Sequence, residues 1–227
     1  MEPVDFEERL VEATHVLQDG VEGLDDWVFA TSLGAEDMVV LDLIRKHRPT
    51  VSVFMLDTGR LHEETYTFLS DVEAYYGIRI DVVSPATASL ETLIARDGIN
   101  GFYQSIEARQ ACCAVRKVEG LARMLAGKPG WITGQRRTQS VTRDQLATVH
   151  WDSRFGLWKR NPLASWNRHH VWHYLTIHAV PTHPLHAIQM PSIGCAPCTR
   201  SITAGEDERA GRWWWEAPAS KECGLHR

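Results

Sequence analysis

Five cysteines occur in this chain of 227 residues, and their spacing separates four of them from the fifth. Two are adjacent, two form a C-x-x-C pair and one stands alone near the C-terminus: Cys112, Cys113, Cys195, Cys198 and Cys223. Adjacent cysteines are poorly suited to bond to each other, because the ring that they would close is strained. In a reducing compartment the pattern indicates four metal ligands and one reactive thiol rather than disulfides.

The four paired cysteines offer four thiolates, which suit either tetrahedral zinc or a [4Fe–4S] cluster. Structural zinc sites mostly use two C-x₂₋₄-C pairs, and the adjacent pair fits that pattern poorly. We therefore favour the cluster over zinc, with buried free cysteines as the remaining alternative. Arg116 and Lys117 follow the adjacent pair and would place positive charge beside an anionic cluster, although the same two residues could form a solvated helix face.

Cys223 lies in the polar stretch 221–226, with Lys221 before it and His226 after it. A thiol in that setting is exposed, and neighbouring cations favour the thiolate, which is its nucleophilic form. Position alone favours an inert tail thiol, so a reactive role for Cys223 rests on the cysteine count and on the basic segments elsewhere in the chain.

Two arginine-rich segments could bind an anion. Three arginines follow a predicted strand and two more lie near the C-terminus: Arg136, Arg137, Arg143, Arg209 and Arg212. Guanidinium groups match phosphate and sulfate oxygens with two parallel hydrogen bonds, whereas a typical arginine is simply solvated. We expect a polyanionic ligand only because these segments accompany strand ends and the candidate reactive cysteine.

Short apolar runs alternate with helical periodicity along the first two thirds of the chain. The runs predict strands over 27–31, 50–56, 78–83, 131–134 and 147–151, and the periodicity predicts helices over 35–46, 62–76 and 115–126. This alternation implies an α/β fold with a doubly wound, mainly parallel sheet. Ligands of such sheets bind beyond the carboxyl ends of the strands, which selects the turns 31–37, 56–60 and 134–143. Each turn taken alone could be an ordinary strand–helix connection.

Composition limits the classes of function. The chain has 24 Lys and Arg against 29 Asp and Glu, which is not the balance of a nucleic-acid-binding protein. Its acidic N-terminus lacks the features of a signal peptide, and no stretch approaches the roughly 20 apolar residues that cross a membrane. We expect a cytoplasmic protein, with a nucleotide- and cluster-binding domain over 1–204 and a mobile tail over 205–227 that carries Cys223.

Six motifs occur together and in one order: 32–37 (SLGAED), 56–60 (LDTGR), the Cys-Cys pair with Arg-Lys, 134–140 (GQRRTQS), 194–200 (GCAPCTR) and 221–226 (KECGLH). Over about 27–226 they resemble the assimilatory adenylyl-sulfate (APS) reductases of the iron–sulfur type, in the PAPS/APS reductase family. The resemblance implies the adenine-nucleotide α-hydrolase-like fold with a flexible C-terminal tail. In that family the first loop usually reads Ser-x-Ser-Gly-Ala-Glu-Asp, whereas Leu33 here carries no hydroxyl for a phosphate contact.

The resemblance also implies a reaction. The Cys223 thiolate attacks the sulfur of adenosine 5′-phosphosulfate, AMP leaves, and thioredoxin reduces the S-sulfocysteine to release sulfite for cysteine biosynthesis. The paired cysteines would hold a [4Fe–4S] cluster that orders the site without carrying the electrons, and Lys117 would link it electrostatically to the substrate. The residues expected to bind the phosphosulfate or line the nucleotide pocket are Arg143, Arg209, Arg212, His226, Thr31, Gly34, Leu56 and Gly134.

Alternatives stay open. The nearest is a reductase of the 3′-phosphorylated substrate, PAPS. A second is an ATP pyrophosphatase-type enzyme on the same fold, although the loop 31–37 lacks the Ser-Gly-Gly-x-Asp-Ser pattern of that chemistry. The third is a non-catalytic zinc or thioredoxin-binding protein, for which the run Trp213–Trp215 could be either core or interface. A homo-oligomer is also possible.

Overall fold

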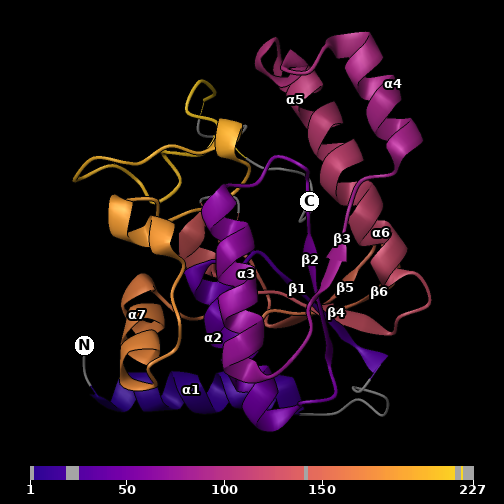
Figure 1. The fold of residues 1–227 in the computed structure, drawn as a ribbon. Coiled ribbons are helices and arrows are strands. Elements are labelled where there is room, and N and C mark those ends of the chain that lie inside the picture. The colour runs from indigo at the N-terminus through magenta and orange to yellow at the C-terminus, as the bar shows by residue number, and fades with distance from the viewer. Residues whose placement is uncertain (1–2, 19–25, 141–142, 218–220, 222–227) are drawn as a thin grey trace.

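The computed structural model describes residues 3–18, 26–140, 143–217 and 221. Its centre is a six-stranded sheet in the order β3-β2-β1-β4-β6-β5 (Figure 1). All neighbouring strands are parallel except β5 and β6, which are antiparallel. The strands are β1 (Val28–Thr31), β2 (Ser52–Leu56), β3 (Asp81–Val83), β4 (Gly130–Ile132), β5 (Val149–Asp152) and β6 (Leu157–Arg160). The predicted α/β class and mainly parallel sheet are confirmed.

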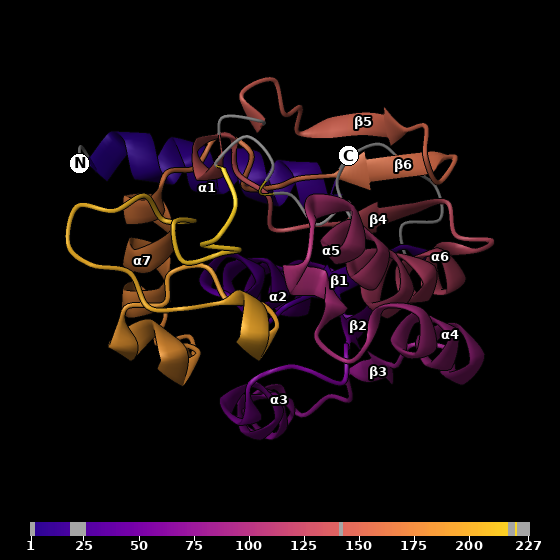
Figure 2. The ribbon, with the colours of Figure 1, turned by 90° about the horizontal axis from the view of Figure 1, so that it is seen from above.

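Helices cover both faces of the sheet, as Figure 2 shows from above. One side carries α1 (Pro3–Gln18), α2 (Ala35–His47), α3 (Glu63–Tyr76) and α7 (Arg168–Ile177). The other side carries α4 (Thr87–Asp97), α5 (Ile106–Cys113) and α6 (Glu119–Leu125). None of the helices in the described part of the chain is long and apolar enough to span a membrane.

The central strand shows why both faces must be covered. Successive side chains of a strand point to opposite faces. Phe29 accordingly packs with α1, α2, α3 and α7, whereas Val28 packs in a second apolar cluster with Leu121 and Leu125 of α6. Both strand residues are almost fully buried, as expected of a parallel sheet with helices on its two sides.

Several elements were not predicted. Strand β6 and helices α1, α4, α5 and α7 escaped sequence analysis, and the predicted fifth strand is β5, an antiparallel strand at the sheet edge. The helix predicted over 115–126 begins earlier, because α5 continues through a π-helical turn (Ala114–Val118) into α6. The predicted start at residue 115 was therefore wrong, because Cys112 and Cys113, which precede it, already lie at the end of α5 inside a continuous helix.

The order of strands places a topological switch at the centre of the sheet. After β1 the chain builds β2 and β3 on one side, and it later adds β4 on the other side of β1. The chain consequently leaves the neighbouring strands β1 and β4 toward opposite edges of the sheet, which forms a crevice at the carboxyl ends of the strands. In open α/β sheets this is where ligands bind.

Candidate active site

A cleft of about 200 Å³ lies beyond the carboxyl ends of β1, β2 and β4. Its walls come from the turns after these strands, from the helix that bears the adjacent cysteines, and from the segments 191–194 and 208–213. Eight residues that sequence analysis assigned to substrate or to the cluster's surroundings line it: Thr31, Gly34, Leu56, Lys117, Gly134, Arg143, Arg209 and Arg212. Cys223 and His226 lie outside the described residues.

The turn after β1 is fixed by hydrogen bonds to Asp37. The backbone N–H and the hydroxyl of Ser32 both donate to Asp37 Oδ2, at 2.6 and 2.7 Å. Leu33 adopts a left-handed conformation with φ of 59°, and its fully buried side chain packs in the core instead of lining the cleft. A missing hydroxyl at Leu33 therefore removes no side-chain contact from the cleft.

Gly134, which follows β4, lies directly against the turn after β1. A Cβ at Gly134 would lie 2.3 Å from Asp37 Oδ1, so only glycine fits without displacing that carboxyl group. Burial raises the pKa of Asp37 to about 6, against the opposing effect of the hydrogen bonds from Ser32. The two turns are thus locked together around one carboxyl group.

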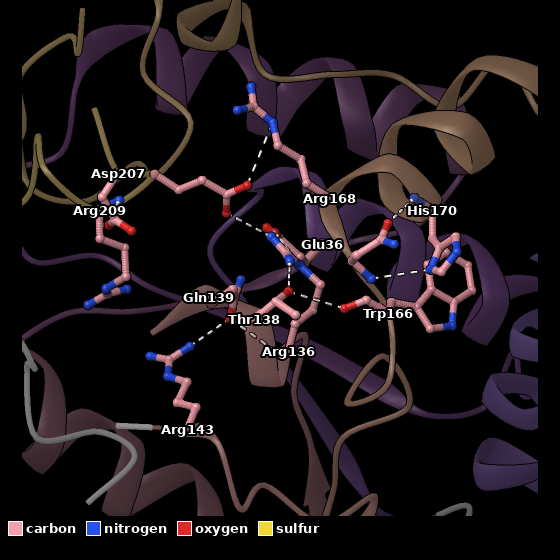
Figure 3. Close-up of polar contacts among 12 residues, drawn as sticks. Glu36, Arg136, Thr138, Gln139, Arg143, Trp166, Arg168, His170, Asp207 and Arg209 are labelled. Carbon is pink, nitrogen blue, oxygen red and sulfur yellow. Dashed lines mark hydrogen bonds and ion pairs between the residues drawn. The ribbon is translucent and has the colours of Figure 1, made fainter. Parts of the chain in front are cut away.

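Only one of the three arginines after β4 lines the cleft. Figure 3 shows the polar contacts of Arg136 and of Arg143. Arg136 is 1% exposed and binds Glu36 and Glu208 at 2.6 and 2.9 Å, so that its charge is balanced by two carboxylates. Arg137 donates to a backbone carbonyl. Arg143 lines the cleft and donates to Gln139 Oε1 at 2.7 Å. Arg136 and Arg137 therefore hold the fold, contrary to the expectation that all three bind an anion.

The C-terminal arginines reach the cleft from a segment that is packed on the domain. Arg212 donates to the carbonyl of Ile193 at 3.1 Å, and its guanidinium lies 4.6 Å from the ring centre of Trp213. Trp213 is 1% exposed, which settles its place as core, whereas Trp214 is exposed. Arg209 donates to the backbone carbonyl of Lys221 at 2.8 Å.

The four paired cysteines form one apolar cluster with Phe102, Trp213 and Trp215. Cys112 and Cys113 come from the end of α5, and Cys195 and Cys198 come from a loop more than 80 residues later that ends in a 3₁₀ turn. Cys113 and Cys198 are buried, and the other two are half-buried. The structure thus brings together the two pairs that the sequence singled out.

The surroundings of these thiols fit an anionic group bound by thiolates. Burial raises the pKa of the Cys198 thiol to about 11, and the nearby charges of Arg212 and Lys117 act in the opposite direction. Burial likewise raises the pKa of Cys112, against the charge of Arg116. Because a bound metal favours the thiolate form, a set of four cysteines beside several cations suits a metal centre of net negative charge.

The donor set also bears on the kind of centre. Among the described residues, no three His, Cys, Asp or Glu side chains form a group that could hold a metal ion. The four thiols are, by their chemistry, a donor set for either a [4Fe–4S] cluster or a tetrahedral zinc ion.

Two residues of the turn after β2 contact the loop that carries Cys195 and Cys198, although the sequence assigned that turn to the nucleotide. The hydroxyl of Thr58 lies 3.2 Å from Cys195 Sγ, and the carbonyl of Arg60 accepts from the Ala196 N–H at 2.8 Å. The side chain of Arg60 also stacks on Phe102, 5.1 Å from the ring centre. The position of the turn at a strand end was visible in the sequence, but its cysteine partner was not.

Known proteins resemble the chain over most of its length. A family model described as the phosphoadenosine phosphosulfate reductase domain matches residues 26–201. A protein of Allochromatium vinosum named adenosine 5′-phosphosulfate reductase is 53% identical over 219 residues, which cover 96% of this chain and 86% of that protein.

Solved structures share the fold. The phosphoadenylyl-sulfate (PAPS) reductase of Candida auris, in a phosphate complex, has a TM-score of 0.70 and 25% identity, covering 89% of this chain and 98% of its own. The FMN adenylyltransferase of Candida glabrata, in complex with FAD and pyrophosphate, has a TM-score of 0.60 at 14% identity, covering 87% and 67%. At that identity the second match concerns the fold alone, which is the adenine-nucleotide α-hydrolase-like fold that sequence analysis predicted.

Proposed function

Because the chain belongs to the phosphoadenosine phosphosulfate reductase domain family, we propose that it reduces adenosine 5′-phosphosulfate to sulfite and AMP, as part of sulfate assimilation and cysteine biosynthesis. Thioredoxin is the proposed electron donor. The observation that carries the proposal is one cleft in which basic residues of three separate segments lie beside a set of four cysteines.

The cleft suits an adenine nucleotide with an anionic end. Leu56 and Trp131 supply apolar surface for a flat base. Gly34 begins α2 without a side-chain cap, so the first backbone N–H groups of this helix remain for a ligand, and helix N-termini bind phosphate. Arg143 and Arg209 approach from separate segments and can bind phosphate or sulfate oxygens.

Cys223 is the proposed nucleophile. Lys221, two residues before it in sequence, is tied to the cleft, because its carbonyl accepts from Arg209 and its ammonium donates to the carbonyl of Ala210 at 3.2 Å. The Cys223 thiolate attacks the sulfur of the substrate, an S–S bond forms, and the bond between sulfur and the bridging phosphate oxygen breaks with its electron pair on AMP. His226 is proposed to assist in holding the phosphosulfate.

Reduction then needs two electrons from a dithiol. A thioredoxin thiolate attacks Cys223 Sγ of the S-sulfocysteine, sulfite leaves with the electron pair of the S–S bond, and the second thioredoxin thiol resolves the mixed disulfide. We propose that the tail 205–227 must present Cys223 first to the substrate and then to thioredoxin. Its described part packs on the domain through Trp213.

A [4Fe–4S] cluster is proposed to be held by the paired cysteines, where it would supply a fixed anionic centre that organises the site. Cys112 and Cys113 would bind it from the helix, and Cys195 and Cys198 from the loop. Lys117 lines the cleft and acts electrostatically on Cys198, so it can bind the anionic end of the substrate from the cluster side.

One experiment tests the mechanism directly. The protein is purified without oxygen, mixed with APS in the absence of thioredoxin, and digested for mass spectrometry. A peptide containing Cys223 should carry one added SO₃ group, and thioredoxin should remove it as sulfite. The Cys223→Ser variant should give neither adduct nor sulfite while keeping wild-type iron and sulfide. An active enzyme without this adduct would refute the mechanism.

PAPS is the second candidate substrate, because the Candida auris neighbour is a PAPS reductase. The 53% identical relative is named for the substrate without the 3′-phosphate, which favours APS. Steady-state rates with both nucleotides decide between them, and equal or faster turnover of PAPS would replace the APS assignment. Two smaller proposals are tested separately. Cell fractionation tests whether the protein is cytoplasmic, and light scattering of the purified protein tests whether it forms a homo-oligomer.

A further inference from the structure

One buried ion pair ties the C-terminal segment 206–217 to the helix that bears the adjacent cysteines. Arg109 of α5 donates from Nε and Nη2 to the two carboxylate oxygens of Glu216, both at 2.8 Å. The two side chains are 0% and 4% exposed. Arg109 also interacts electrostatically with Cys113, one helical turn later in α5. The guanidinium thus joins a carboxylate of the tail to a cysteine of the apolar cluster.

Trp213 lies between two arginines. The guanidinium carbons of Arg109 and Arg212 are each 4.6 Å from the centre of its ring, and that of Arg209 is 6.0 Å away. The backbone N–H of Trp213 donates to the carbonyl of Cys198 at 3.1 Å, which fixes the indole against the second cysteine pair. Arg109 and the two cleft arginines therefore contact one rigid side chain.

The other ion pairs of this segment are more exposed. Arg200 binds Glu206 at 2.8 Å, and their side chains are 37% and 31% exposed. Glu208 binds Arg136, but its side chain is 26% exposed, and it lies near Arg168 at the surface (Figure 3). Water can replace part of that contact, whereas it cannot easily replace a carboxylate that is removed from a fully buried arginine. The pair of Arg109 and Glu216 is therefore the contact whose loss should release the segment.

We propose that Arg109 is a positioning residue for the substrate-binding arginines. By binding Glu216 and stacking on Trp213, it holds Arg209 and Arg212 in the cleft, and its contact with Cys113 makes their placement depend on the cysteine site. The part of this inference that concerns substrate binding rests on the proposed function. The attachment of the segment 206–217 to the domain does not depend on that function.

The test compares Glu216→Gln with the wild-type holoenzyme. The amide keeps the shape of the side chain but removes the charge, so the segment should open more often. Trypsin should then cleave after Arg209 and Arg212 several-fold faster, with the sites identified by mass spectrometry. The dissociation constant of AMP should rise about tenfold, and KM for APS should rise more than kcat falls, with iron content unchanged.

Asp42→Asn is the matched control. Asp42 is buried in an ion pair with Lys46 at 2.7 Å and accepts hydrogen bonds from two tyrosines, but it does not line the cleft. Its loss should lower stability while leaving tryptic cleavage of the segment and AMP affinity at wild-type values. Glu216→Asp, which keeps the charge, should fall between Glu216→Gln and the wild type, and it serves as the test if Glu216→Gln does not fold.

Wild-type cleavage and AMP affinity in folded, iron-loaded Glu216→Gln or Glu216→Asp would overturn the inference. So would equal effects in the Asp42→Asn control, because the change would then reflect general destabilisation. If the wild type fails to turn over APS, the proposed function is wrong, while the cleavage comparison without nucleotide still reports on the anchor.

Discussion

The two sides of the cleft are built in different ways. On the nucleotide side, the turns after β1 and β4 meet through contacts of Asp37 with Ser32 and Gly134, all at the ends of neighbouring strands. On the cysteine side, the parts come from the turn after β2, from α5 and from the segments 195–198 and 212–216. Figure 1 shows α4 and α5 projecting beyond the strand ends on this side.

This difference predicts that substitutions on the two sides of the cleft will have different structural effects. The nucleotide side is held by the sheet itself, so its geometry exists before any ligand binds. The cysteine side gathers four thiols, of which Cys112 and Cys198 have pKa values raised by burial, and it is completed only when a metal centre favours the thiolates. Substitutions on the nucleotide side should therefore change only neighbouring contacts. Substitutions on the cysteine side should disturb all the segments that form that side of the cleft.

The largest effect is expected for Cys195→Ser. A serine keeps the volume but binds iron poorly, so iron and sulfide should be lost and sulfite release should fall at least about 100-fold. Tryptic cleavage within 206–217 should also increase, because Trp213 packs against the same cysteines. AMP affinity should fall much less. Cys223→Ser controls for the loss of a thiol, and normal iron content in Cys195→Ser would contradict the ligand assignment.

Gly134→Ala should have an intermediate and local effect. Its Cβ would meet Asp37 Oδ1 at 2.3 Å and force the two turns apart. Overpacking of this kind costs about 1–3 kcal/mol, so we expect AMP affinity to fall roughly tenfold to 100-fold with iron content unchanged.

The control is Gly127→Ala, because an added Cβ at Gly127 meets open space; unlike Gly134, Gly127 has a positive φ, of 73°. It should lose about 1 kcal/mol of stability through backbone strain and keep wild-type AMP affinity. Equal AMP affinity in Gly134→Ala and the wild type would show that the turns are not locked as described.

The smallest effect concerns pH. The pKa of Asp37 is raised by burial from 3.8 to about 6, so the stability that its neutral form contributes is fully present below pH 4 and is lost as the pH rises through 6. Relative to Asp37→Asn, the wild type should lose about 1 kcal/mol of unfolding free energy between pH 4 and 7, a value reduced for solvent screening because the residue as a whole is only half-buried. Urea denaturation of both proteins measures this; parallel pH profiles would contradict the raised pKa.

Much of the nucleotide side was visible in the sequence. The strand that ends at Thr31 reads as a short apolar run, and the rule that ligands bind at strand ends selected the turns 31–37 and 134–143, which both contribute to the cleft. The failures there came from side-chain direction. Leu33 points into the core because its backbone is left-handed, and Arg136 turns to Glu36, 100 positions away in sequence.

On the cysteine side, the sequence predicted the ligand candidates but not the contacts between distant segments. Residue type and count in the sequence were enough to separate four ligand candidates from Cys223, because thiol chemistry depends on the residue itself. The spacing did not reveal that Arg109 meets Glu216, or that Thr58 meets Cys195, since these contacts join residues 107 and 137 positions apart. Local periodicity carries no information on such pairs.

The sequence by itself determined five of the six strands, the turns at the carboxyl edge of the sheet and the identity of the chemical groups, because each of these depends on neighbouring residues or on a side chain alone. Only the tertiary structure decided which groups face the cleft. It directs Arg143, Arg209 and Arg212 into the cleft and Arg136 into the fold, because burial and a carboxylate partner govern where each guanidinium can lie. The fold therefore decides which of the similar charges remain available to a ligand.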